Sequence, residues 1–299
     1  MSQAALVLLG LLSVLAMFYV ARWIMLERPR SAGDSRRPGL IHTLTGFVTN
    51  FFDTLGVGSF APTTSVFKLF NLVPDEKIPG TLNSGHALPT VAQALFFIAA
   101  VSVDPVTLVG MIAAAVVGAW IGSGIVSKLP RRAIQIGMGV ALLFAASLFI
   151  LKIFNEGPAD GSATGLTGQL LAIAIAVNFL LGALMTLGIG LYAPCLILVS
   201  LLGMNSDAAF PIMMGSCAFL MPVAGLRFIG ARSYEPRAAI GLAIGGIPGV
   251  LIAAIVVKSL SLNWLRWLVV IVVLYAAFTM LWSARRKSAA SDTHQTNNG

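Results

Sequence analysis

Charged residues are scarce in this sequence of 299 residues. Asp, Glu, Lys and Arg together make up 10% of the chain, whereas soluble globular domains hold about a quarter. Hydrophobic residues make up 58%, and the mean hydropathy is +0.91. This composition excludes a soluble globular domain and predicts an all-α polytopic membrane protein that lies in a lipid bilayer.

Cysteine is also rare. The two cysteines, Cys195 and Cys217, lie inside apolar segments without a CxxC or Cys/His spacing. This excludes a disulfide framework, and we expect no metal site and no cofactor. The sequence also lacks the Gly-x-Ser-x-Gly and His-Glu-x-x-His motifs, and it has no second membrane acid that would form a dyad with Asp53. These absences argue against an intramembrane enzyme.

The net charge of +8 would suit a nucleic-acid partner, but Lys and Arg occur in short clusters between apolar runs. Such clusters set membrane topology by staying in the cytoplasm, so we expect no nucleic-acid binding. With the N-terminus outside and the C-terminus in the cytoplasm, all but three of the 19 Lys and Arg fall inside. The exceptions are Lys152, Lys258 and Arg266. This distribution favours two halves of inverted orientation over two parallel halves.

One nine-residue stretch occurs twice, as Thr54-Leu-Gly-Val-Gly-Ser-Phe-Ala-Pro62 and, 132 positions later, as Thr186-Leu-Gly-Ile-Gly-Leu-Tyr-Ala-Pro194. Six of the nine residues are identical. Each copy interrupts an apolar run, and the pieces of about 15 residues reach only about 22 Å as helices, too short to span a bilayer alone. In transporters, Gly/Pro-interrupted segments at corresponding positions of two halves point to a binding site.

We therefore predict two inverted repeats, each with a broken or re-entrant helix pair followed by three spans, preceded by one extra N-terminal helix. Each broken pair could equally be two short tilted crossings. The predicted segments are an N-terminal transmembrane helix (1–22), a cytoplasmic basic linker (23–40), repeat 1 (41–151), an extracytoplasmic loop (152–169), repeat 2 (170–282) and a cytoplasmic tail (283–299).

The glycines of the duplicated stretch allow a backbone with positive φ and close approach of a ligand. Pro62 and Pro194 are tolerated in the first turn of a helix, so the second helix of each pair is expected to start near residues 59–61 and 191–193. Two helix N-termini would then face the middle of the membrane and form an anion site. The alternative is that the glycines are packing contacts between helices.

The predicted substrate-binding residues are the glycines of the two breaks and neutral hydrogen-bonding residues around them: Gly56, Gly58, Ser59, Thr63, Asn83, Ser84, Gly188, Gly190, Tyr192 and Ser216. Asp53 is a candidate for ion coupling because a membrane carboxylate is costly, although a structural hydrogen bond is an equal alternative. His86 is a second candidate, with packing as its alternative. Lys68 and Arg227 lie toward predicted cytoplasmic ends, where snorkelling to the interface is the simpler interpretation.

The duplicated glycine-punctuated segment followed by Ala-Pro, the polar elbow before the next span and the basic corners resemble the sulfite exporter TauE/SafE family over residues 41–282. The resemblance implies a permease of the bacterial cytoplasmic membrane that moves sulfite, sulfonates or related organic anions with ion or proton coupling. In this sequence Ser59-Phe60 and Leu191-Tyr192 follow the second glycine in place of a longer glycine run, which leaves the particular substrate open.

Three alternatives remain at this point. The chain could be a cation- or proton-linked permease that uses Asp53 as the ion ligand, an intramembrane enzyme, or an assembly protein that transports nothing. The sequence also leaves open whether the chain forms a homo-oligomer.

Overall fold

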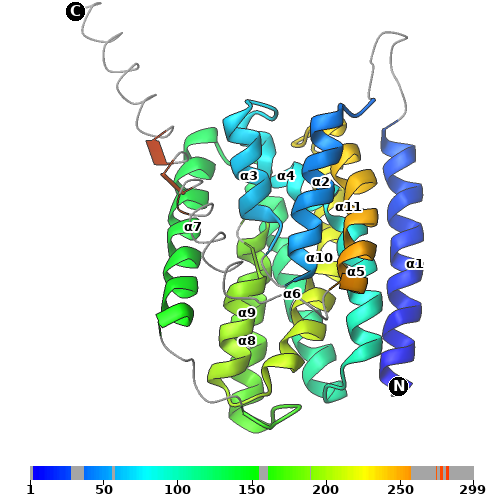
Figure 1. Ribbon diagram of the computed structural model, residues 1–299, viewed down its shortest axis with the longest axis vertical. Coiled ribbons are helices and arrows are strands. Elements are labelled where there is room, and N and C mark those ends of the chain that lie inside the picture. The colour runs from blue at the N-terminus through cyan, green and yellow to red at the C-terminus, as the bar shows by residue number, and fades with distance from the viewer. Residues whose placement is uncertain are drawn as a thin grey trace, which may run out of the picture.

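The computed structural model describes residues 3–27, 37–55, 58–154, 161–188, 190–256 and five positions near the C-terminus (274, 277, 278, 281 and 282). Within these residues the chain forms a bundle of α-helices and no β-strand (Figure 1). Five helices are long and apolar enough to cross a membrane. The prediction of an all-α polytopic membrane protein is confirmed.

The first helix, α1 (Gln3–Leu26), lies against the bundle along one face. The Tyr19 hydroxyl donates to the Ser84 carbonyl oxygen at 2.9 Å, and Trp23 Nε1 donates to the Tyr234 hydroxyl at 3.1 Å. The helix continues to Leu26, four residues past the end of the predicted transmembrane segment 1–22. The boundary between this segment and the linker at 23–40 stays a prediction, and residues 28–36 lie outside the described part of the chain.

The remaining described helices form two series that begin alike, each with a helix, a short helix and a 3-10 turn. The first half contains α2 (Leu40–Thr54), α3 (Phe60–Leu69), the 3-10 turn Asp75–Lys77, α4 (Ile78–Gly85), α5 (Ala87–Ala100), α6 (Pro105–Val126) and α7 (Arg131–Phe154). The second half contains α8 (Gly168–Met185), α9 (Tyr192–Leu201), the 3-10 turn Ser206–Ala208, α10 (Ala209–Gly230) and α11 (Pro236–Val256). In the second half α10 alone takes the place of α4 and α5. The predicted last span lies mostly outside the described residues, as does the predicted tail.

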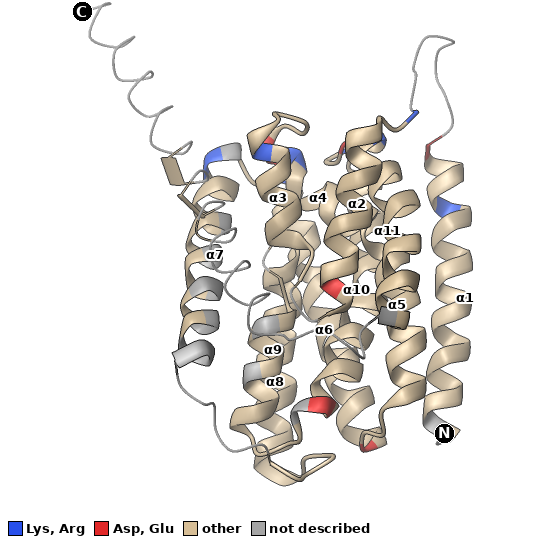
Figure 2. Cartoon of the chain, viewed as in Figure 1, with Lys and Arg blue, Asp and Glu red and all other residues tan. Residues whose placement is uncertain are grey.

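The first broken pair starts and finishes at one end of the bundle. We call it the basic end, because most of the described Lys and Arg residues lie toward it (Figure 2). The start of α2 meets α11 there, where Arg237 Nε donates to the Arg37 carbonyl oxygen at 3.3 Å. The end of α3 lies at the same end, where Lys68 Nζ is 2.8 Å from Asp75 Oδ1. The chain therefore enters along α2 and returns along α3 (Figure 1).

The second broken pair starts and finishes at the opposite end. The Asp104 amide, which precedes α6, donates to the Thr164 carbonyl oxygen at 2.9 Å just before α8 begins. The Asn205 amide, which follows α9, donates to the Ala163 carbonyl oxygen at 2.8 Å. The two pairs thus approach the middle of the bundle from opposite ends, and each turns back at its break (Figure 1).

The two halves interlock. Helix α2 packs on α11 of the second half, and α8 packs on α6 of the first half. A Cβ atom at Gly249 would lie 2.3 Å from the Phe47 carbonyl oxygen, and one at Gly118 would lie 2.0 Å from the Phe179 carbonyl oxygen. These two contacts occupy equivalent positions in the duplication, so glycine permits the same close helix approach in both halves.

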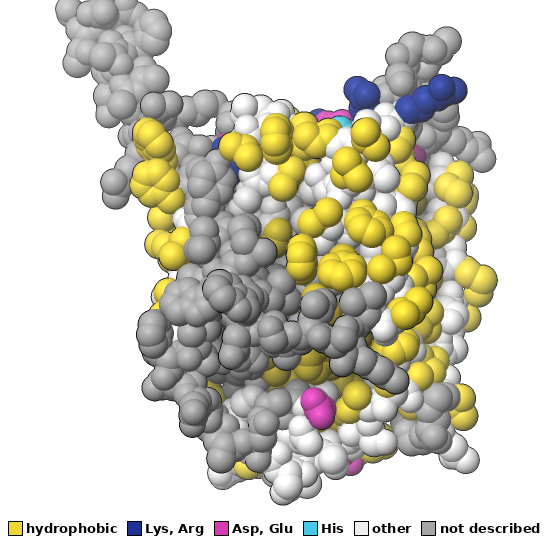
Figure 3. All heavy atoms as spheres, viewed as in Figure 1, with side chains coloured by type: hydrophobic (Ala, Val, Ile, Leu, Met, Phe, Trp, Pro, Cys, Tyr) yellow, Lys and Arg dark blue, Asp and Glu magenta, His cyan; other side chains and the backbone are white. Residues whose placement is uncertain are grey.

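Hydrophobic side chains cover much of the described surface on the face shown in Figure 3, between the two ends of the bundle. Exposed examples are Phe18, Trp120, Phe144 and Leu251. An exposed apolar surface of this extent is expected in lipid and not in water.

Candidate functional site

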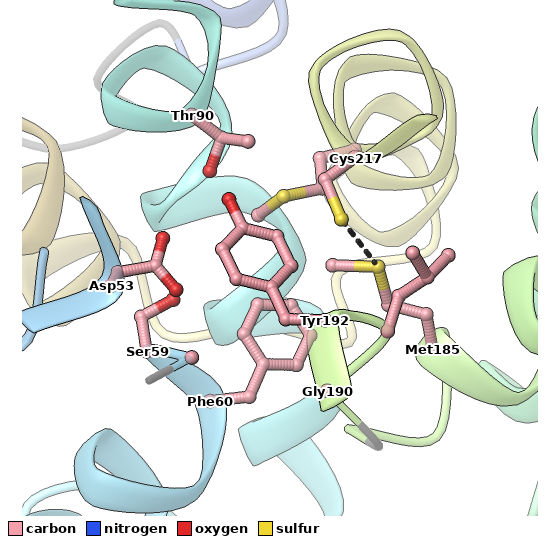
Figure 4. A pocket seen from close by; sticks show the side chains of 11 residues that line it. Asp53, Ser59, Phe60, Thr90, Met185, Gly190, Tyr192 and Cys217 are labelled. Atoms are coloured by element: carbon pink, nitrogen blue, oxygen red, sulfur yellow. Dashed lines mark hydrogen bonds between the residues drawn. The ribbon is translucent and has the colours of Figure 1, made fainter. Parts of the chain in front are cut away.

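The two breaks border one small cavity in the middle of the bundle (Figure 4). Its volume is about 10 Å³, the space of roughly one water molecule. Residues from α2, the first break, α3, α5, the end of α8, the second break, the start of α9 and α10 surround it. They are Asp53, Gly58, Ser59, Phe60, Thr90, Met185, Gly190, Leu191, Tyr192, Cys217 and Met221.

Both half-helices begin where the sequence predicts, because α3 starts at Phe60 and α9 at Tyr192. Ser59 is the N-cap residue of α3, and its side chain makes no capping hydrogen bond. The first N–H groups of a helix have no partner within the helix, so each N-terminus presents backbone donors and the positive end of a dipole. The cavity therefore lies at two helix N-termini that belong to different halves of the chain.

The glycines of the two breaks differ in backbone conformation. Gly58 has a φ of 86° and Gly188 a φ of 95°, conformations that favour glycine. Gly190 has no positive φ, and a Cβ atom at either Gly58 or Gly190 would meet no other atom within 4 Å. Gly58 and Gly190 border the cavity, whereas Gly188 supports the turn behind it. Gly56, also a predicted site residue, lies outside the described residues.

Asp53 lies at the end of α2 with 2% of its surface exposed. Its Oδ2 atom accepts a hydrogen bond of 2.9 Å from Gln93 Nε2 on α5. Gln93 Oε1 in turn accepts a hydrogen bond of 2.6 Å from the Tyr192 hydroxyl at the start of α9. These three buried side chains connect the first break to the second, and we call them the Asp53–Gln93–Tyr192 chain.

His86 belongs to a separate buried cluster. Its Nδ1 atom lies 2.9 Å from Asn50 Nδ2 and 3.1 Å from Asn50 Oδ1, and its Nε2 atom lies 3.0 Å from the Thr63 hydroxyl. The Thr63 hydroxyl also donates to Thr49 Oγ1 at 3.1 Å. His86 and Thr63 therefore tie α2, α3 and the α4–α5 junction together, and neither of them borders the cavity.

Three more predicted residues are buried beside the breaks without bordering the cavity. Asn83 Nδ2 donates to the Pro79 carbonyl oxygen at 2.9 Å and approaches the Met185 carbonyl oxygen at 3.5 Å. Asn83 Oδ1 and Ser84 Oγ have no hydrogen-bond partner. Ser216 Oγ accepts a hydrogen bond of 3.1 Å from Asn178 Nδ2. The structure thus brings Asp53, Gly58, Ser59, Gly190 and Tyr192 to one cavity and places the other described candidates around it.

The walls of the cavity differ between the two halves. The first half contributes the Asp53 carboxylate, Ser59 and Thr90. The second contributes sulfur atoms from Met185, Cys217 and Met221, and Cys217 Sγ lies 3.5 Å from Met185 Sδ (Figure 4). Met185 occupies the position in repeat 2 that Asp53 occupies in repeat 1. The carboxylate therefore has no symmetry-related counterpart, and any role it has belongs to one half.

The described cations lie away from the cavity. Lys68 pairs with Asp75 at the basic end. Arg227 donates to the Trp120 carbonyl oxygen at 2.6 Å, and its guanidinium lies 5.0 Å from the centre of the Trp120 ring. Neither side chain supplies positive charge to the cavity in this structure.

Gln93 was not among the residues predicted from the sequence. It lies on α5 three residues after Thr90 and seven after His86, so the three polar residues fall on one helix face. That spacing within an otherwise apolar run was the available signal. No comparable signal marks Met185, Cys217 or Met221, because apolar and sulfur-containing side chains are common throughout membrane helices.

A sequence model described as "Sulfite exporter TauE/SafE" matches residues 1–149 and 170–299. The match includes α1, so this helix is not the addition to the family that the sequence resemblance implied. The unmatched residues 150–169 run from the end of α7 into the start of α8 and contain the predicted 152–169 loop. No curated protein matches the chain.

Proposed function

We propose, on the premise that this chain belongs to the sulfite exporter TauE/SafE family, that it carries sulfite, a sulfonate or a related small anion through the cavity between the two breaks. Membership in this family makes the chain a membrane transporter of the sulfite or anion type. The members of the family are transporters and not enzymes. The particular substrate and the coupling ion are part of the proposal.

One observation supports this proposal above the others. Two re-entrant pairs reach the same cavity from opposite ends and point a helix N-terminus at it. Backbone donors at helix N-termini bind oxyanions, and inverted pairs of this kind border the substrate in other transporter folds. A four-atom oxyanion needs more room than the single water that the cavity admits, so we expect the cavity to widen during transport.

The charge of the cavity supports coupling to a proton. Among the described residues that border it, Asp53 is the only charged side chain. An ionised carboxylate repels an anion strongly in surroundings of low polarity. The anion is therefore expected to bind when Asp53 carries a proton, and the two would cross the membrane together.

We further propose that the basic end faces the cytoplasm, because cytoplasmic loops of membrane proteins carry an excess of Lys and Arg. Single cysteines can be introduced at Ser102, in the exposed loop before α6, and at Lys128, in the exposed corner after it. A membrane-impermeant maleimide added outside whole cells is expected to label Ser102→Cys and to spare Lys128→Cys. Cys195 and Cys217 are buried and give little background. The reverse labelling pattern would invert the proposed orientation.

The function itself is tested with purified protein in liposomes loaded with a pH indicator. Sulfite and sulfoacetate are expected to move with protons, whereas Na⁺ and K⁺ salts of an impermeant anion are expected to give no flux. In detergent, a bound anion at 100 times its Kd raises the free energy of unfolding by about 2.7 kcal/mol, which a thermal melt detects. Cation flux without anion flux would favour a cation-linked permease, and no flux with no thermal shift would favour a protein that transports nothing.

A further inference from the structure

The Asp53–Gln93–Tyr192 chain joins three helices around the cavity. Asp53 lies in the last turn of α2, Gln93 lies in the middle of α5, and Tyr192 begins α9. All three side chains are buried, and the hydrogen bonds between them are 2.9 Å and 2.6 Å long. A change at Asp53 therefore has a direct hydrogen-bonded route to the N-terminus of the opposite half-helix.

The orientation of the Gln93 amide is fixed by a fourth residue. The Thr54 hydroxyl donates its proton to the Asn50 carbonyl oxygen at 2.8 Å. Toward Gln93 Nε2, 3.1 Å away, the Thr54 oxygen therefore acts as an acceptor. Both Gln93 N–H groups are then used, one by Thr54 and one by Asp53. The amide oxygen must face Tyr192.

This arrangement suits the ionised form of Asp53. A carboxylate accepts from the Gln93 amide as a charged partner, and such bonds are about twice as strong as neutral ones. A protonated carboxyl group can still accept from Gln93 through the oxygen that carries no proton, but this bond is neutral and about half as strong. The amide cannot compensate by flipping, because its oxygen would then face the lone pairs of Thr54. Protonation of Asp53 therefore weakens the chain at Gln93.

Gln93 is not the only group that hydrogen-bonds to Asp53 among the described residues, because Tyr192 and Ser59 also contact the carboxylate directly. The titratable groups that face Asp53 among the described residues are Tyr192 on α9 and Cys217 on α10. Ser59, just before α3, lies against the carboxylate and donates to it through its hydroxyl and its backbone amide (Figure 4). His86 is engaged with Asn50 and Thr63 in its own cluster.

We infer that Gln93 is a positioning residue that couples the proton on Asp53 to closure of α9 over the cavity. When Asp53 is ionised, Gln93 holds Tyr192 and the cavity stays closed. When Asp53 is protonated, Tyr192 is released and the N-terminus of α9 is free to move, which admits the anion. The inference rests on the proposed function for its substrate, but the closure itself can be observed without any substrate.

The buried cysteines provide the readout. Cys217 borders the cavity, and Cys195 lies on α9 one turn after Tyr192. At one fixed pH, at which thiol reactivity is the same in every variant, N-ethylmaleimide labelling is followed by mass spectrometry in wild type, Gln93→Leu and Tyr192→Phe. Each variant is expected to label at least about tenfold faster, since a hydrogen bond linked to a charged group is lost. The double variant is expected to label no faster than Gln93→Leu, because both changes break one chain.

Gln135→Leu is the matched control. Gln135 is also a buried glutamine that donates to a carboxylate, Asp75 Oδ2 at 2.5 Å, but it lies at the basic end. Its replacement is expected to lower thermal stability and leave the cysteine labelling rate unchanged. Equal acceleration in Gln135→Leu, or independent additive effects of Gln93→Leu and Tyr192→Phe, would overturn the inference. Tyr192→Phe keeps the ring and tests the chain even where Gln93→Leu folds poorly.

Transport separates this inference from the proposed function. In liposomes that contain wild-type protein, sulfite flux is expected to change at least about tenfold between pH 6 and pH 8, and in Gln93→Leu less than about twofold. If Gln93→Leu keeps the wild-type pH profile and labelling rate, Gln93 does not couple the two events and the anion site is unaffected. If wild type moves no anion, the proposed function fails, and the labelling result still decides the role of Gln93.

Discussion

Asp53→Asn is expected to abolish anion transport driven by a pH gradient, with a loss of at least about 100-fold, while anion exchange across the membrane continues. Asparagine keeps the shape of the side chain and can still accept a hydrogen bond from Gln93, but it cannot gain or lose a proton. It resembles the protonated carboxylic acid in charge, so an anion can still bind. The measurement compares sulfite uptake driven by a pH gradient with sulfite counterflow at equal pH on both sides.

Asp75→Asn controls for the loss of any buried carboxylate. Asp75 is 3% exposed and accepts hydrogen bonds from Lys68 and Gln135 at the basic end, away from the cavity. Its replacement leaves the Lys68 ammonium without that carboxylate, so stability is expected to fall, while the pH dependence of transport remains. If Asp53→Asn instead keeps the wild-type response to a pH gradient, Asp53 has a structural role and another group carries the proton.

Gly190→Ala is expected to fold normally and to lose at least about 90% of transport. Gly190 borders the cavity without a positive φ, and an added Cβ atom would meet no protein atom within 4 Å. The free energy of unfolding should therefore change by less than about 0.5 kcal/mol. The methyl group would instead occupy space that the anion needs. Thermal melts and sulfite flux measured on the same preparation separate these two effects.

Two other glycines provide contrasts for this experiment. Gly58→Ala combines the same methyl group with a φ of 86°, so it is expected to cost about 1–2 kcal/mol in addition to the loss of transport. Gly249→Ala would place its Cβ atom 2.3 Å from the Phe47 carbonyl oxygen and should reduce the amount of folded protein. Normal transport by Gly190→Ala, together with loss of anion affinity in Lys68→Ala or Arg227→Ala, would move the site to the side-chain cations.

The parts of the fold that the sequence predicts well are those set by local chemistry. Pro62 and Pro194 mark the first turns of α3 and α9 because proline lacks an amide donor, and both helices begin two residues before their proline. The duplicated glycines located the breaks, which meet at the cavity. The carboxylate of Asp53 was also recognisable, since an acid in an apolar run is rare.

The parts that the sequence did not predict depend on contacts between distant segments. Gln93 gains its importance from Asp53 and Tyr192, which lie 40 residues before it and 99 residues after it. The sequence around Thr63 and around His86 does not show that these two residues bind each other instead of bordering the cavity. The contact of Trp23 was not predicted either, because its partner, Tyr234, is 211 residues away.

The interlocked halves have a consequence for how the chain is made. Helix α6 has already been synthesised when its partner α8 is made. Helix α2, in contrast, is made before its partner α11, whose first residue follows the end of α2 by about 180 positions. At a synthesis rate of about 5–20 residues per second, that delay is roughly 10 to 40 seconds. During this time Asn50 and Asp53 belong to a helix too short to span the bilayer and without its final neighbour. We therefore expect the first re-entrant helix to stay associated with the ribosome-bound insertion machinery until α11 has been synthesised.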